Sequence, residues 1–268
     1  MPCCVRFFLF SLITCKLQIE TGIPQDSEKK ASTLLNIKSN KILTITGPRR
    51  CGKTYLARQI LKKTIKTPKD RKNTMIINFE EPAFYQNQNL EYLTKLYTAY
   101  KNILSPEKRP TIVLDEIQEI PGWEKFVRSL QEKNEANIII IGSSAKLLSS
   151  ELSTLLTGRT LKISLFPFSF KETLACKKIN YNDKFTMATK TQVLKNTAKH
   201  YLKFGGYPEI ILEKSDEIKK MILKNIYTDI IYKDAVKRYN IKNISKFESL
   251  AYYYLTNISS PITYNKIS

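Results

Sequence analysis

The eight residues GPRRCGKT at positions 47–54 constrain the fold of this chain more than any other segment. They match the spacing G-x-x-x-x-G-K-[ST], in which glycines let the backbone curl until successive N–H groups converge on phosphate oxygens. The segment follows a short apolar, β-branched run at 41–47 and precedes an amphipathic segment at 54–63. This context predicts a strand, a phosphate-binding loop and a helix whose positive dipole end faces the phosphates.

The alternation of strand and helix continues to about residue 170. Further strands are predicted at 74–81, 111–117, 137–144 and 160–167, and helices at 89–104, 123–133 and 146–156. The strands are apolar almost throughout, which is typical of parallel strands that are buried on both faces. The sequence therefore predicts an α/β fold of the P-loop nucleotide-hydrolase class, with a parallel sheet covered by helices on both faces.

The loop residues have expected roles toward ATP. Lys53 is expected to place its charge against the β- and γ-phosphates, and the Thr54 hydroxyl to bind Mg²⁺. Arg49 and Arg50 could face phosphate or solvent, or one of them could brace the loop against a neighbouring carboxylate. The residues expected to bind the nucleotide are Gly47, Pro48, Arg49, Arg50, Cys51, Gly52, Lys53 and Thr54.

Two acidic residues, Asp115 and Glu116, follow the apolar run TIVL of the strand at 111–117. Ligands of parallel α/β sheets bind at the carboxyl ends of the strands, where this pair emerges. Asp115 is expected to accept from the water shell of the magnesium, and Glu116 to polarise the attacking water. The alternative is that both acids only cap the following helix.

Ser143 and Ser144 end another predicted strand at the same edge. Either hydroxyl could bond the γ-phosphate or orient the water, and Ser144 could instead cap the next helix, or do both.

Charge narrows the choice of partners. Lys plus Arg total 44 against 24 Asp plus Glu, a net charge of +20. Such a surface attracts polyanions, so nucleic acid is the first expected partner and anionic membrane the second. A general bias toward Lys, Ile and Asn is the alternative, although it would usually raise Glu as well. Five scattered cysteines and one histidine offer neither a zinc site nor a Ser-His-Asp triad, and this thiol usage suits a reduced cytoplasm.

Four segments are expected: a helical extension at 1–33, the ATPase core at 34–170, a helical lid at 171–240 and an incomplete winged helix at 241–268. Residues 5–15 are apolar but shorter than the ~20 residues that cross a bilayer. Because no small-residue cleavage site follows, we expect an amphipathic or buried helix there, with a secretory signal as the alternative. No stable membrane span is expected, and the expected location is cytoplasmic.

Four blocks of sequence resemble the archaeal and bacterial AAA+-type P-loop ATPases. They are GPRRCGKT, LDEIQEIPGWEKFVRSL, IIGSSAKLLSSELSTLLTGRTLKISLFPFSFKE and FGGYPE, in the family's order and at about its spacing. The resemblance covers about residue 19 to the end of the chain. Longer family members continue through a winged helix, so this chain is expected to be a truncated product, which puts DNA binding through that domain in doubt.

The resemblance implies several roles. Asp115 and Glu116 take the Walker B positions, and Ser143 or Ser144 the sensor position. Arg159 matches an arginine that senses or neutralises γ-phosphate charge, in its own or a neighbouring subunit; a structural ion pair is the alternative. Pro208, in GGYP, matches an element that lets a helical lid close near the nucleotide base, and an ordinary turn between two helices is its alternative.

Two functions remain open. The first is Mg²⁺-dependent ATP hydrolysis that drives a conformational switch, sensed by a nucleic acid, a protein partner or a second copy of the chain. The second is a nucleotide-gated binding module with little or no turnover. A P-loop small-molecule kinase fits less well, because the chain has no arginine-rich substrate lid and the acid pair suits activation of water.

Overall fold

The computed structural model describes residues 40–87, 89–143, 156, 158–180 and 189–258. The expected helical extension at 1–33 and the helix at 146–156, apart from Leu156, lie outside these residues. The chain divides into two compact units, of which the first ends at Leu212 and the second begins at Glu213. This division falls inside the segment expected as a lid at 171–240, and the four-part organisation stays a prediction.

The first unit is built on a five-stranded parallel sheet in the order β2-β3-β4-β1-β5. The strands are β1 Ile42–Gly47, β2 Thr74–Asn78, β3 Thr111–Asp115, β4 Asn137–Ser143 and β5 Thr160–Ser164. Because β1 lies between β4 and β5, the strand order reverses there, and the carboxyl end of β1 is a topological switch point. The parallel α/β fold expected from the sequence is confirmed.

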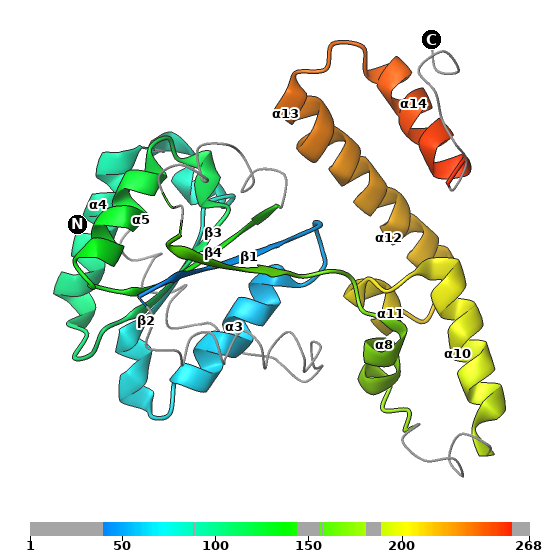
Figure 1. Ribbon diagram of the computed structural model, residues 1–268, viewed down its shortest axis with the longest axis horizontal. Helices are drawn as coiled ribbons and strands as arrows, with labels where there is room; N and C mark the ends of the chain where they lie inside the picture. The colour runs from blue at the N-terminus through cyan, green and yellow to red at the C-terminus, as the bar shows by residue number, and fades with distance from the viewer. Residues whose placement is uncertain (1–39, 88, 144–155, 157, 181–188, 259–268) are drawn as a thin grey trace. The chain divides into compact units, whose positions relative to one another are not determined.

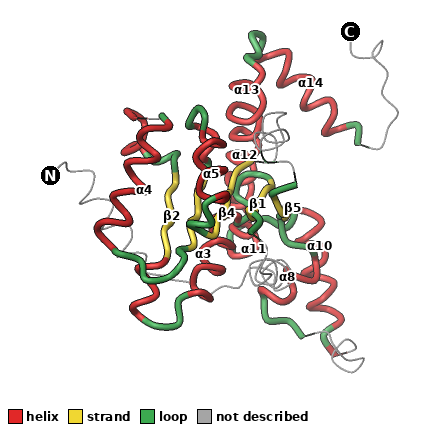
Figure 2. The backbone as a smooth tube through the Cα atoms, turned by 60° about the vertical axis from the view of Figure 1, so that its left-hand side comes forward, coloured by secondary structure: helices red, strands yellow, loops and turns green. Residues whose placement is uncertain are grey.

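Helices cover both faces of this sheet (Figures 1 and 2). Helix α3, Lys53–Thr64, packs on one face, where Leu56, Ala57 and Ile60 join the apolar side chains of β1 and β4. Helices α4, Leu90–Leu104, and α5, Trp123–Glu132, pack on the other face. Every residue of β1 and β3 is buried, as expected for central strands of a parallel sheet that is covered on both faces.

Three short 3₁₀ helices connect these elements: η1 Pro68–Asn73, η2 Pro82–Asn87 and η3 Ile117–Glu119. The strands expected at 74–81 and 111–117 therefore end earlier than the sequence suggested, at Asn78 and Asp115. The cause at β3 is local: Glu116 has a φ of 54°, in the left-handed region, so the chain turns immediately after Asp115.

Among the described residues, the last part of the first unit contains the helices α8 Phe170–Cys176, α10 Thr191–Phe204 and α11 Pro208–Leu212. The Phe168 N–H donates to the Gly206 carbonyl at 2.7 Å, and the Tyr201 hydroxyl donates to the Phe168 carbonyl at 2.9 Å. These bonds tie the turn between α10 and α11 to the segment that follows β5.

The second unit is helical. It contains α12 Asp216–Asp229, a π-helical segment Ile230–Val236, α13 Lys237–Tyr239 and α14 Ile244–Thr256. The Tyr232 hydroxyl donates to Glu248 at 2.8 Å and joins the π-helical segment to α14. Among the helices that the structure describes, none combines the length and apolar character that a bilayer span requires.

Candidate nucleotide site at the carboxyl edge of the sheet

The loop between β1 and α3 is held in a tight curve by glycine. A Cβ on Gly47 would lie 2.0 Å from the Leu165 carbonyl oxygen, so no other residue fits without movement of the backbone. Gly52 has a φ of 96° and forms the cap of α3, which has no side-chain cap and no acidic residue in its first turn. The start of α3 therefore offers its N–H groups to an anion without a competing carboxylate.

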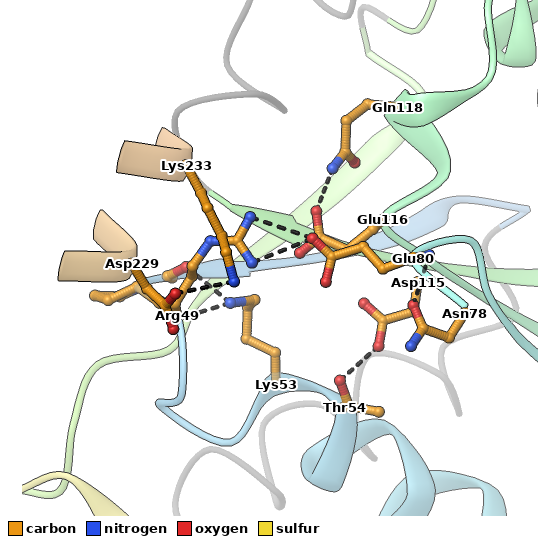
Figure 3. Close-up of polar contacts among 12 residues, drawn as sticks. Arg49, Lys53, Thr54, Asn78, Glu80, Asp115, Glu116, Gln118, Asp229 and Lys233 are labelled. Atoms are coloured by element: carbon orange, nitrogen blue, oxygen red, sulfur yellow. Dashed lines mark hydrogen bonds and ion pairs between the residues drawn. The ribbon is translucent and has the colours of Figure 1, made fainter. Parts of the chain in front are cut away.

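Lys53 and Thr54 begin α3 and point toward the loop and the acid pair (Figure 3). Lys53 is buried, and its Nζ donates to the carbonyls of Gly47 at 3.0 Å and Pro48 at 2.8 Å. The Thr54 hydroxyl donates to Oδ2 of Asp115 at 2.5 Å. The loop thus carries a buried cation and a hydroxyl at the end of β3.

Asp115 and Glu116 lie at this edge, as expected from the sequence, and both are buried. Burial raises the pKa of Asp115, and the nearby Glu80 adds to this, while the Thr54 hydrogen bond and Lys53 oppose it. Burial is also the main cause that raises the pKa of Glu116, followed by the charges of Glu80 and Asp115. Two carboxyl groups with perturbed pKa values, close to a lysine and a hydroxyl, indicate a candidate catalytic site.

Three residues that the sequence analysis did not single out lie beside the loop and the acid pair: Asn78, Glu80 and Gln118. Both terminal nitrogens of Arg49 donate to Oε1 of Glu80, at 3.1 and 3.2 Å. The Glu80 N–H donates to Oδ1 of Asn78, which is paired in register with Asp115. Gln118 donates through Nε2 to Oε2 of Glu116. Asn78 and Glu80 could have been found, because they lie at and just after the carboxyl end of β2, which must share the edge with Asp115.

The GGYP segment lies beside the loop. Arg50 forms an ion pair with Glu209 of α11 at 3.4 Å, and Pro208 is the first residue of that helix. Burial raises the pKa of Tyr207, and the Cys51 side chain of the loop is the second cause. Each loop arginine thus contacts a carboxylate, and the helix that begins at Pro208 is connected to the loop through Arg50.

Arg159 lies at the opposite edge of the sheet from the loop. It precedes β5 directly, and its carbonyl accepts from the N–H of Ile42, the first residue of β1. Its guanidinium contacts Gln131 at 3.0 Å and Glu132 at 3.1 Å, both at the end of α5. Six residues of β1 separate the two edges by about 17 Å. In this structure Arg159 forms the ion pair that the alternative expects, at the edge opposite the loop. Its role toward the γ-phosphate, in its own or a neighbouring subunit, stays a prediction.

Ser143 is the last residue of β4 and is paired in register with Gly47, so its backbone lies at the loop edge. Ser144 lies outside the described residues. The predicted roles of both serines stay predictions.

The residues present fit a nucleotide with Mg²⁺. Among the described residues, no group of three or more His, Cys, Asp or Glu side chains could hold a metal by itself. Mg²⁺ does not need such a group, because it typically uses one or two protein oxygens together with substrate phosphates and water. The adjoining oxygens of Thr54 and Asp115 are ligands of this kind, next to a glycine cradle that a Cβ at position 47 would fill.

The structure combines a parallel sheet, a phosphate loop after the strand at the switch point, and an acid pair at the same edge. This combination defines the class of P-loop nucleotide-binding proteins. Residues 39–174 match the family described as the AAA domain, and the chain belongs to that family. Residues 195–268 match a family described as a domain of unknown function.

Curated relatives are longer than this chain. An uncharacterized protein of Methanocaldococcus jannaschii is 37% identical over 265 residues, which cover 96% of this chain and 58% of that protein. An uncharacterized protein of Haemophilus influenzae is 29% identical over 227 residues, covering 85% and 54%. The chain spans a little over half the length of these relatives.

Similar solved structures include Caenorhabditis elegans PCH-2, at 14% identity and a TM-score of 0.44, which covers 76% of this chain and 66% of that one. Another is the Aeropyrum pernix ORC1 protein in complex with DNA, at 11% identity and a TM-score of 0.45, covering 96% and 84%.

Proposed function

We propose that this protein binds ATP with Mg²⁺ and hydrolyses it, and that the cycle switches the helices that follow the sheet. One observation carries the proposal: Lys53 and Thr54, at the start of α3, lie in one cluster with Asp115, the last residue of β3, and Glu116, which follows it. Binding needs only the loop, whereas the buried acid pair beside it supplies the groups that activation of water requires.

Each residue has a distinct task in this proposal. Lys53 exchanges its bonds to the Gly47 and Pro48 carbonyls for bonds to phosphate oxygens, and these bonds hold the cation beside the loop before the anion arrives. Thr54 and Asp115 hold Mg²⁺, which screens the phosphate charge when it is bound. Their mutual hydrogen bond keeps both oxygens at the same point before the ligand arrives.

Glu116 is the proposed general base. Its raised pKa brings the carboxylate closer to the working pH, where a base accepts a proton most effectively. The Gln118 amide holds one carboxylate oxygen, which leaves the other to accept from water. Gln118 is a positioning residue in this scheme.

The switch is proposed to run through Arg50. A phosphate in the loop competes with Glu209 for this half-exposed arginine, and Glu209 belongs to α11, one residue after Pro208. Release of Glu209 would free α11 from the loop, so the state of the nucleotide would reach the helices beyond it. A polyanion, a protein or a second copy of the chain would sense the change.

The test is hydrolysis of ATP by the purified chain with Mg²⁺, compared with the Glu116→Gln variant. We expect Glu116→Gln to lower the turnover number by roughly 10²- to 10⁴-fold while ATP binding persists, because only the base is lost. Equal turnover of the two proteins would refute the assignment of the base. Tight binding with no turnover by the unaltered chain would instead support the nucleotide-gated module.

A further inference from the structure

A dense run of Lys and Arg lies at the far end of α3 from the loop. Six of the eleven residues at positions 62–72 are Lys or Arg, against 44 of 268 in the whole chain. We call them the basic cluster, and all six are exposed: Lys62, Lys63, Lys66, Lys69, Arg71 and Lys72. Because α3 has 12 residues, the cluster lies about 18 Å from the phosphate loop (Figure 1).

Residues 62–72 include one acid, Asp70, whose carboxylate is hydrogen-bonded to neighbouring groups. Its carboxylate accepts from the backbone N–H groups of Thr67 at 2.8 Å and Lys66 at 3.1 Å, and from Lys108 at 3.3 Å. The Thr67 bond is the main cause that lowers the pKa of Asp70 to about 2. No carboxylate of the described chain forms an ion pair with five of the cluster's cations, which are Lys62, Lys66, Lys69, Arg71 and Lys72.

The backbone that carries the cluster is fixed. The 3₁₀ helix η1 begins with a capping box between Thr67 and Asp70. The hydroxyl of the buried Tyr100 donates to the Lys72 carbonyl at 2.7 Å, and the Lys108 N–H donates to the Asn73 side chain at 3.2 Å. Interaction of α3's dipole with basic residues in its last turn accounts for Lys62 and Lys63 alone, and it leaves the four cations beyond the helix unexplained.

The chemistry of the cluster favours one kind of polyanion. Residues 58–73 contain no aromatic side chain on which unpaired bases could stack, so recognition of a single strand is disfavoured. They also include no exposed large apolar side chain, which binding at a membrane surface would use as an anchor. Regularly spaced phosphates of a double helix need only fixed cations.

We propose that the basic cluster binds the phosphate backbone of double-helical nucleic acid without reading its sequence. The proposal rests on the proposed function only in choosing the polyanion among the partners named there, and it does not require hydrolysis. It places the contact on the domain that carries the sheet, at the edge opposite the nucleotide. Nucleic acid and nucleotide can therefore be bound at the same time.

The experiment measures binding of the full chain to a duplex DNA of about 20 base pairs by fluorescence anisotropy, without nucleotide, at several salt concentrations. The test variant replaces Lys62, Lys66, Lys69 and Lys72 by Gln. The matched control replaces four exposed lysines elsewhere, Lys125, Lys162, Lys195 and Lys199, by Gln, so that the net charge falls equally. Thermal unfolding and ATP turnover without DNA establish that each variant is folded and that its nucleotide site is intact.

Six phosphate contacts would give log K a slope of about −5 against log salt for the unaltered chain. The test variant should bind on the order of 10²-fold more weakly at about 0.1 M salt, with a slope smaller by about 3 to 4. The control should bind like the unaltered chain. If the test variant unfolds, the pair Lys69→Gln and Lys72→Gln should reduce the slope by about 2.

Equal losses in the test variant and the control would overturn the proposal, because net charge alone would then explain binding. A larger loss in the control would place the contact elsewhere and would also overturn it. Binding to vesicles of phosphatidylserine and phosphatidylcholine, without binding to DNA, would make a membrane the partner instead. ATP turnover without DNA should be equal in all three proteins, so failure of this proposal is distinguishable from failure of the ATPase assignment.

Discussion

Substitution of Gly47 by Ala tests whether the curve of the phosphate loop depends on close backbone contact. A Cβ at this position would lie 2.0 Å from the Leu165 carbonyl oxygen and 3.1 Å from the Cys51 sulfur. The loop must retreat by more than 1 Å to reach an ordinary contact of 3.4 Å. That movement pulls on the bond from the Leu165 N–H to the Thr46 carbonyl, which is 2.7 Å long.

Overpacking of this kind costs about 1–3 kcal/mol, and loss of one buried backbone bond costs a similar amount. Together they predict a fall of roughly 2–5 kcal/mol in the free energy of unfolding, or roughly 5–15 °C in Tm at this chain length. Displacement of the loop should also weaken ATP binding, because the N–H groups of the loop would no longer be aligned with the phosphate oxygens.

The matched control is Gly122→Ala. Gly122 has a φ of 76°, but no atom lies within 4 Å of its added Cβ. Only the left-handed backbone is then penalised, by about 1–2 kcal/mol, and ATP binding should be unchanged. Differential scanning fluorimetry and titration with a fluorescent ATP analogue measure both effects. If Gly47→Ala were no more damaging than Gly122→Ala in both assays, the contact with Leu165 would not be what shapes the loop.

Three further predictions concern charged residues of the first unit. Glu80→Gln should lower the pKa of Glu116 by removing a negative neighbour, so the low-pH limb of kcat/KM for ATP hydrolysis should move to lower pH. The control Glu81→Gln, at the exposed neighbouring residue, should leave this limb in place. Equal pH profiles of the two variants would contradict the argument. Glu116→Gln should stabilise the nucleotide-free protein at neutral pH. The raised pKa of Glu116 makes wild-type stability fall as pH rises from the ordinary value of about 4.3 through the raised value, and Gln has no such penalty. The advantage in Tm should therefore grow with pH, and a constant difference from pH 5 to 8 would argue against it. Arg159→Ala should lower the free energy of unfolding by roughly 0.5 kcal/mol, because its ion pair with Glu132 is partly exposed. ATP turnover of the monomer should be unchanged. A tenfold fall in that turnover would contradict a purely structural role of Arg159.

The sequence was sufficient to predict the phosphate loop and the position of Asp115, because the local pattern and the geometry of a parallel sheet agree there. Residues 47–54 combine a spacing rule with flanking strand and helix patterns, so the loop could be predicted from one short segment. The apolar run before Asp115 predicted a parallel strand, and such strands must bring their carboxyl ends to one edge. The hydrogen bond between Thr54 and Asp115 is the outcome of these two rules.

The remaining contacts depend on strand order, which local patterns do not contain. Arg49 meets Glu80 because β2 pairs with β3 at the edge of the sheet, and Arg50 meets Glu209 from 159 residues away. The resemblance placed Arg159 near phosphate, whereas its position before β5, at the amino end of β1, sets it at the opposite edge. Sequence spacing alone does not distinguish the two edges for a residue between strands.

The most direct test of the central claim is the identity of the nucleotide that remains bound after the chain is incubated with Mg²⁺-ATP and passed rapidly through a desalting column. Wild-type protein should release phosphate and retain ADP, Glu116→Gln should retain unhydrolysed ATP at close to one per chain, and Lys53→Ala should retain neither. ATP recovered intact from the wild type, or ADP formed equally by Glu116→Gln, would contradict a hydrolytic site built from Lys53, Thr54, Asp115 and Glu116.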